Sequence, residues 1–239
     1  EAAKELTYSS LLSFTKVYFE PNNRVVSAVS PQPTTLVAKQ LLSGVSTSPS
    51  KEYALTEKAY QTPSSSFAID TPGGGERSYL FWGFVKDIDP ADKAAIKALS
   101  LLLSDKIIFD VREKQGMAYR MSATSNVRDN KVLFYITLGT RPQNTDVLVP
   151  QFPKLMSKEY LGDISETDVQ KAINMYLGRM MFRRLSSVNQ AYYLGTSLFF
   201  HDDMNEDQSQ LNALKKVTLE DVNRVAAKYL SAENPISIV

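Results

Sequence analysis

The octet Arg112-Glu113-Lys114-Gln115-Gly116-Met117-Ala118-Tyr119 decides how the fold of this chain is interpreted. Upstream of it, residues 96–111 carry apolar side chains at helical spacing, which predicts a helix with Arg112 in its last turns. Gly116 predicts the end of that helix, and Tyr119 opens a segment that alternates like a strand. The octet therefore predicts a helix, a glycine turn and a strand in direct succession.

Two explanations of this turn compete. In an ordinary helix C-terminus, cations occupy the last turn and a glycine follows it, which accounts for every residue of the octet except Tyr119. Local physics alone favours that explanation. The functional alternative is that the turn aims the Arg112 guanidinium and the Tyr119 phenol at one spot.

The composition excludes several classes of protein. The 239 residues are enough for one large domain or two small ones. Lys plus Arg number 27 and Asp plus Glu number 26, so we expect no nucleic-acid partner, because no excess positive charge is present for phosphates. No apolar run approaches the roughly 18 residues that cross a bilayer, so we expect no membrane span. Residues 1–6 lack the apolar core of a signal peptide and read as the interior of a longer protein or an artificial boundary.

Cysteine and histidine limit the chemistry. Cysteine is absent, which excludes disulfides, thiolate metal sites and a cysteine nucleophile. The single histidine, His201, cannot supply the two imidazoles of a His-Glu-x-x-His or His-x-x-Glu-His zinc site. We therefore expect no metal site here and no residue that is catalytic on its own. The compartment stays open, since the lack of cysteine and of a targeting segment is compatible with the bacterial periplasm or cytoplasm.

Periodicity and capping signals predict an alternation of helices and strands. Helices are expected at residues 6–17, from Thr34 or Thr35 as a cap to 42, and at 90–111, 144–160, 165–200, 206–215 and 219–230. Strands are expected at residues 25–29, 67–70, 79–85, 119–127, 131–139 and 235–239. Residues 44–63 read as a polar linker, and Gly73-Gly74-Gly75 as a hairpin turn between two strands.

The two ends of the chain resemble each other. Residues from Thr7 onward align without a gap with residues from Thr218 onward, and both segments read as a helix that ends in an aromatic residue, a polar turn with asparagine and a β-branched strand. This self-similarity predicts duplicated units. Residues 1–30 would then be a lead-in helix and first strand, the tail of a preceding repeat, and residues 31–239 one domain. Chance is the competing explanation for so short a match.

With residues 101–111 before it, the octet resembles the non-catalytic C-terminal half of M16 (pitrilysin-type) zinc peptidases, the family of insulin-degrading enzyme and mitochondrial processing peptidase. Arg112, Gly116 and Tyr119 match its Arg-x-x-x-x-Gly-x-Tyr spacing. A Tyr-Phe-x-Pro-x-Asn turn at 18–23 and a Ser-Tyr-x-x-x-Gly-Phe strand at 78–84 agree, so the resemblance covers nearly the whole chain.

Two features depart from the family pattern. The inverted zinc motif His-x-x-Glu-His is absent, which puts independent catalysis out of reach. Leu103-Ser104-Asp105 stands where a Gly-rich bend is usual, which leaves the local backbone geometry in doubt.

The resemblance implies an α+β fold for residues 31–239: an antiparallel sheet covered by helices, of the LuxS/MPP-like metallohydrolase type. It implies that Arg112 and Tyr119 bind a peptide and stabilise the transition state of its hydrolysis at a zinc held by another half. This chain would hold no cofactor. Its partners would be the peptide substrate and a zinc-bearing half, on the same polypeptide or on a separate subunit.

Two other functions compete with the peptidase half. One is a catalytically silent structural or assembly subunit of the same fold, and the other is an unrelated α+β binding domain that carries the octet by chance. Retention of both Arg112 and Tyr119 favours the peptidase half, because a silent relative has no chemical need for the pair.

Overall fold

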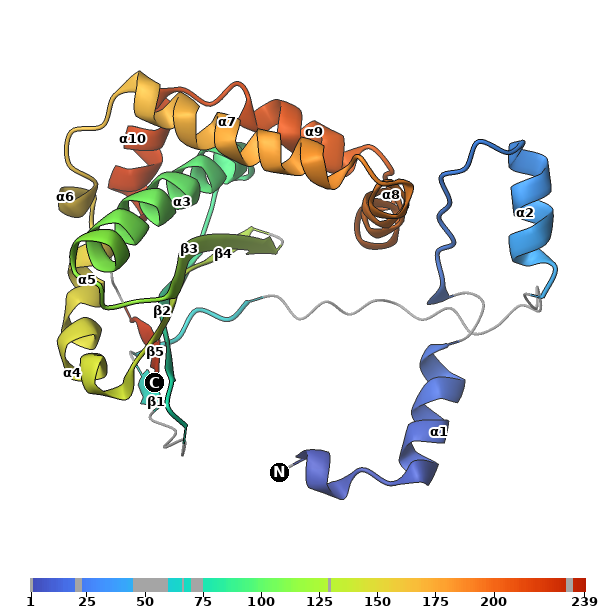
Figure 1. The fold of residues 1–239 in the computed structure, drawn as a ribbon, viewed down its shortest axis with the longest axis horizontal. Helices are drawn as coiled ribbons and strands as arrows, with labels where there is room; N and C mark the ends of the chain where they lie inside the picture. The colour runs from blue at the N-terminus through green and yellow to red at the C-terminus, as the bar shows by residue number, and fades with distance from the viewer. Residues whose placement is uncertain are drawn as a thin grey trace. The chain divides into compact units, whose positions relative to one another are not determined.

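The computed structural model describes residues 2–19, 23–44, 60–65, 67–69, 75–128, 130–230 and 234–239. The chain divides into two compact units; Figure 1 labels their helices and strands. The first comprises Glu1–Glu57 and Met180–Ser209, and the second Lys58–Arg179 and Gln210–Val239. Most of the expected linker at 44–63 lies outside the described residues, and a domain boundary at residue 30 stays a prediction.

Among the described residues of the first unit, the regular secondary structure is helical. It contains α1 (Tyr8–Tyr18), α2 (Thr34–Leu42), α8 (Ser187–His201) and parts of α7 and α9. The expected strand at 25–29 is wrong: the segment forms no strand because no described strand pairs with it. Instead, the Ser27 hydroxyl donates to the Ala191 carbonyl of α8 at 2.6 Å. The expected threonine cap of α2 is also wrong, since Pro33 stands at the cap position without a side-chain hydrogen bond.

The second unit is built on a five-stranded sheet of order β1-β5-β2-β4-β3. Its strands are β1 (Phe67–Ile69), β2 (Ser78–Asp87), β3 (Arg120–Arg128), β4 (Lys131–Thr140) and β5 (Ile236–Ile238). All neighbours are antiparallel except the edge pair β1–β5. Because β5 lies between β1 and β2, the expected hairpin between those two strands is wrong; Gly73 and Gly74 of its turn lie outside the described residues.

Helices cover this sheet. They are α3 (Lys93–Ile107), α4 (Thr145–Leu148), α5 (Phe152–Leu155), α6 (Lys158–Leu161), α7 (Glu166–Arg183), α9 (Glu206–Leu214) and α10 (Leu219–Tyr229). The expected helix at 144–160 is broken into short pieces, with Pro150 and Pro153 in first-turn positions that restart a helix. The expected helix at 165–200 is two helices, because the Ser186 hydroxyl caps the amide of Asn189 and starts α8 anew.

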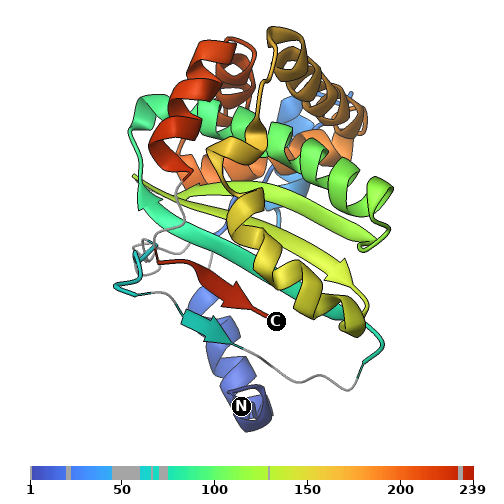
Figure 2. The ribbon, with the colours of Figure 1, turned by 90° about the vertical axis from the view of Figure 1, so that its left-hand side faces the viewer.

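The core lies between the sheet and the helices of one face. Alternate residues of β4, from Val132 to Leu138, are buried with Leu99 and Leu103 of α3. Helix α3 packs on β3, and α10 packs on α3. Figures 1 and 2 show α3, α7 and α10 on the same side of the sheet. The α+β class with a helix-covered, largely antiparallel sheet is confirmed, whereas the parallel edge pair was not anticipated.

A buried carboxylate fixes the start of α3. Asp92 is 1% exposed and accepts hydrogen bonds from the Tyr229 hydroxyl at 2.6 Å and from Lys228 Nζ at 3.2 Å, and it pairs with Arg224. Burial opposes ionisation, but the Tyr229 hydroxyl and the two cations together hold the pKa of Asp92 below its ordinary value. These interactions therefore tie the first turn of α3, the helix that leads to the octet, to α10.

Candidate functional site

The octet forms the predicted helix, glycine turn and strand. Helix α3 continues into a π-helical segment, Ile108–Lys114, which carries Arg112. Gly116 has a φ of 64°, and the amide of Met117 donates to the Val111 carbonyl at 3.1 Å. A side chain is strained at such a φ, so glycine is the residue that lets the chain leave the helix here.

The turn after Gly116 is held by Thr140, the last residue of β4, and by Asn144, which follows that strand. The Met117 carbonyl accepts hydrogen bonds from the buried Thr140 hydroxyl and, at 3.3 Å, from Asn144 Nδ2. Asn144 also donates to Thr140 Oγ1 at 3.1 Å. Sequence reasoning missed both residues. The available signal was a pair of polar side chains four residues apart at the end of an apolar strand.

Tyr119 enters the sheet next to β4, and its ring lies against Gly139. Its amide donates to the Gly139 carbonyl at 3.1 Å. A β-carbon on Gly139 would lie 2.7 Å from Tyr119 Cζ and 2.8 Å from its hydroxyl oxygen. The side chain is 41% exposed, so the phenol is outside the core and accessible to a ligand.

A second tyrosine and an arginine accompany Tyr119. Tyr79, 65% exposed, pairs with Gly139 across β2 and β4, and its ring meets that of Tyr119 edge-on at 6.5 Å between centroids. The Arg77 guanidinium carbon lies 5.2 Å from the Tyr119 ring centroid, within cation–π range. Sequence reasoning missed Arg77 and Tyr79 as site residues. Their signal was a phenol on an exposed position of β2, two residues after a cation.

The two phenols shift each other's pKa in opposite directions. The Tyr79 hydroxyl, followed by partial desolvation, raises the pKa of Tyr119. The Tyr119 hydroxyl, followed by the Arg77 guanidinium, lowers the pKa of Tyr79. Tyr119 therefore keeps its proton across the neutral range and remains a hydrogen-bond donor, the role that the resemblance implies for it.

Arg112 lies at an exposed position of the π-helical segment. Its Nε is 3.5 Å from Oε1 of Glu113, and its side chain is 53% exposed. An exposed pair of this kind stabilises little. Among the interactions of the described residues, none joins Arg112 to Tyr119, whose ring instead contacts Arg77 and Tyr79. That Arg112 and Tyr119 act on one substrate atom stays a prediction.

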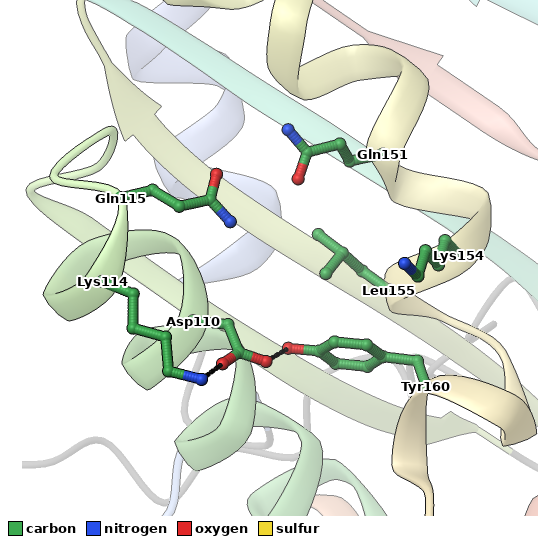
Figure 3. Close-up of a pocket in the computed structure, with 7 residues that line it drawn as sticks. All are labelled: Asp110, Lys114, Gln115, Gln151, Lys154, Leu155 and Tyr160. Atoms are coloured by element: carbon green, nitrogen blue, oxygen red, sulfur yellow. Dashed lines mark hydrogen bonds and ion pairs between the residues drawn. The ribbon is translucent and has the colours of Figure 1, made fainter.

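A polar pocket of about 200 Å³ lies beside the octet (Figure 3). It is lined by Asp110, Lys114, Gln115, Gln151, Lys154, Leu155 and Tyr160. The Asp110 carboxylate accepts from Lys114 Nζ at 2.9 Å and from the Tyr160 hydroxyl at 2.8 Å. Lys114 is the main cause that lowers the pKa of Asp110, while burial and then Asp110 raise the pKa of Tyr160. The bond from Tyr160 ties the octet helix to α6.

The part of the chain that the structure describes contains no group of three or more His, Cys, Asp or Glu side chains that could hold a metal ion. His201 is exposed at the end of α8. A zinc site therefore does not fit the described residues. Within the same residues, no helix is both long and apolar enough to cross a membrane.

Comparisons with known proteins agree with the fold described above. A family model described as the peptidase M16 inactive domain matches residues 5–176. No curated protein matches the chain. Similar solved structures include a protease from Helicobacter pylori (16% identity, TM-score 0.75), a peptidase M16 inactive domain from Pseudomonas fluorescens (18%, 0.68) and the periplasmic protease PqqL from Escherichia coli (19%, 0.61).

The matches cover 98%, 98% and 85% of this chain but only 59%, 57% and 23% of those proteins. This chain thus spans less than two thirds of the length of each. Identities this low establish similarity of fold and nothing finer.

Proposed function

This chain belongs to the peptidase M16 inactive-domain family, and on that premise we propose that it is the non-catalytic half of a zinc endopeptidase. Arg112 and Tyr119 bind the peptide and stabilise the transition state of its hydrolysis. The zinc is held by another half, on the same polypeptide or on a partner subunit.

The position of Tyr119 carries this proposal. Its phenol is exposed, lies against Gly139 and follows a turn held at the Met117 carbonyl by Thr140 and Asn144. Its hydroxyl lies outside the core, and the neighbouring Tyr79 hydroxyl raises the pKa of Tyr119, so the phenol stays a proton donor at neutral pH. A positioned, neutral donor is what stabilisation of a developing oxyanion requires.

A zinc held by the other half, and not by residues of this chain, would supply an activated water when bound. The Tyr119 hydroxyl donates a hydrogen bond to the carbonyl oxygen of the scissile peptide bond, and the bond strengthens as negative charge develops there. Arg112 contributes a charged donor that also binds the ground-state carbonyl. Loss of one such donor typically costs about 3 kcal/mol of transition-state stabilisation.

Complementation with the zinc-bearing half tests the proposal. That half alone should cleave an internally quenched peptide slowly, and addition of this chain should raise the rate. The double variant Arg112→Ala/Tyr119→Phe should assemble equally well, as measured by sedimentation, yet restore little activity. Full activity from an assembled double variant would contradict the proposal.

One observation favours a second candidate, a silent structural subunit. The described contacts of Arg112 involve Glu113 and not Tyr119, so the pair is not assembled as a unit within this chain. In a silent subunit, the wild-type chain and the double variant would raise the rate equally, through assembly alone. The same complementation experiment therefore separates the two functions.

A further inference from the structure

The pocket beside the octet (Figure 3) has two walls that come from separate parts of the chain. One wall is the π-helical segment with the residue after it, and it presents Asp110, Lys114 and Gln115. The other wall runs from Gln151, just before α5, to Tyr160 in α6. The hydrogen bond from the Tyr160 hydroxyl to the Asp110 carboxylate joins the walls at one point. A ligand in the remaining space can therefore contact both walls.

Three polar groups of the pocket have no hydrogen bond or ion pair within the described part of the chain. Two of them are the Lys154 ammonium and the side-chain amide of Gln115, and both side chains are exposed. The third is Gln151 Oε1, because Gln151 uses Nε2 to donate to the Val147 carbonyl at 3.0 Å. Figure 3 shows the Gln115 and Gln151 side chains extending toward each other across the pocket. The pocket therefore offers two donors and one acceptor to a ligand.

Charge and size narrow the class of ligand. The lining contains two lysines and one aspartate, and the Asp110 carboxylate is paired with Lys114 at 2.9 Å. The charge of Lys154 is left over, so a single negative charge on the ligand matches the pocket. The volume of about 200 Å³ is roughly that of seven water molecules in the liquid, which suits a carboxylate with a few attached atoms.

We propose that this pocket binds the free carboxyl end of a peptide whose last residue is small. Lys154 and the Gln115 amide donate to the carboxylate, which accepts strongly from a charged donor. The N–H group of the last residue donates to Gln151 Oε1. The carbon atoms next to the carboxylate pack on Leu155, the apolar member of the lining.

A peptide end matches these groups better than an inorganic anion. A phosphate offers no N–H group to Gln151, and the Asp110 carboxylate opposes a second negative charge in the same pocket. The occupant would also link Gln115, the residue directly before Gly116, to α5 across the pocket. This inference concerns binding alone and does not depend on the roles of Arg112 and Tyr119.

Calorimetric titration of the full chain with N-acetylglycine, which has the carboxylate and the N–H group of a peptide end, tests the proposal. A dissociation constant of about 1 mM is expected for a ligand with so few atoms. N-acetylglycinamide lacks the charge and should bind at least about ten-fold more weakly. Pentanoate keeps the carboxylate but lacks the N–H group, and should bind about five-fold more weakly, the effect of one hydrogen bond.

Three results of these titrations would overturn the proposal. The absence of saturable binding would exclude a site for this ligand. Equal affinity for N-acetylglycine and its amide would exclude a carboxylate site. Equal affinity for pentanoate would exclude a peptide end as the occupant. The titrations involve no hydrolysis, so each of these results leaves the proposed peptidase function to its own assay.

Substitutions locate the binding in this pocket. Lys154→Gln should weaken N-acetylglycine binding about ten-fold at an unchanged melting temperature, because Lys154 is exposed and has no ion pair among the described residues. Lys154→Arg should retain the affinity. Lys158→Gln is the matched control, because it removes the same charge one helical turn later and outside the lining. Asp110→Asn should strengthen binding, since it removes the opposing charge. Wild-type affinity in Lys154→Gln, or equal weakening by Lys158→Gln, would overturn the proposal.

Discussion

The Tyr119 ring occupies the space beside Gly139 that a side chain would fill. A β-carbon on Gly139 would lie 2.7 Å from Tyr119 Cζ, well inside van der Waals contact. The phenol can therefore occupy this position only while residue 139 is glycine. Because the ring is exposed, it has room to move when a side chain is introduced at residue 139.

Gly139→Ala should displace the Tyr119 ring with little loss of stability. We expect the free energy of unfolding to fall by less than about 1 kcal/mol. The activity of the complex with the zinc-bearing half should fall to the level of the Tyr119→Phe complex, because the phenol is displaced. Denaturant melts and peptide kinetics provide the comparison. The matched control is Gly178→Ala in α7, where nothing lies within 4 Å and alanine should stabilise the helix by up to about 1 kcal/mol.

The turn between octet and strand should depend on the Thr140 hydroxyl. Thr140→Val keeps the shape but leaves the half-buried Met117 carbonyl with Asn144 as its described donor, so we expect a loss of about 1 kcal/mol in unfolding free energy. Thr140→Ser retains the hydroxyl and should lose less. Equal destabilisation by both substitutions would show that packing of the methyl group, and not the hydrogen bond, fixes the turn.

Much of the second unit could be predicted from the sequence. The octet and the β3–β4 hairpin have local signals: apolar periodicity, a glycine at positive φ, and alternation on two adjacent strands. The position of β5 could not be predicted in this way, because residues 236–238 pair with strands more than 150 residues away. The same limit explains the wrong strand at 25–29, since β-branched composition does not supply a partner strand.

The Asp92 cluster should contribute stability at neutral pH that acid removes. The carboxyl has a lower pKa in the folded state than its ordinary 3.8, so its contribution is present above that value and is lost as the pH falls through the folded pKa. Asp92→Asn should destabilise the protein at pH 7 by about 1.5–3 kcal/mol, and its difference from wild type should shrink below about pH 4.

Thermal or denaturant melts at several pH values measure this difference. Asp87→Asn is the control, because the Asp87 side chain is 80% exposed in its ion pair with Lys131, and an exposed pair contributes little. A difference between wild type and Asp92→Asn that stayed constant from pH 7 to pH 3 would contradict the assignment of an ionised Asp92.

Tyrosine ionisation should report the pairing of Tyr79 with Tyr119. In an ultraviolet pH titration, Tyr79→Phe should remove a phenol that ionises below the ordinary value of 10, and Tyr119→Phe one that ionises above it. Tyr119→Phe should also return Tyr79 toward its ordinary pKa, because the Tyr119 hydroxyl is the main cause of its shift. Independent titrations, unchanged by removal of the other phenol, would show that the two hydroxyls do not interact.

The candidate site was only partly accessible from the sequence. Tyr119 was found through its spacing from Arg112, a feature of eight consecutive residues. Tyr79 lies in β2 and Arg77 directly before that strand, some forty residues earlier, and they meet Tyr119 only because β2 and β3 both pair with β4. Spacing in the sequence cannot reveal such a neighbour without the sheet order.

The most direct test of the proposed function is the kinetics of Tyr119→Phe in complex with the zinc-bearing half. The substitution removes one hydroxyl and almost no volume, so the melting temperature should hold while kcat falls about a hundred-fold and KM changes little. Tyr79→Phe, the neighbouring phenol, is the control and should retain most of the activity. An unchanged kcat in a folded, assembled Tyr119→Phe complex would contradict a catalytic role for this chain and leave the silent subunit as its function.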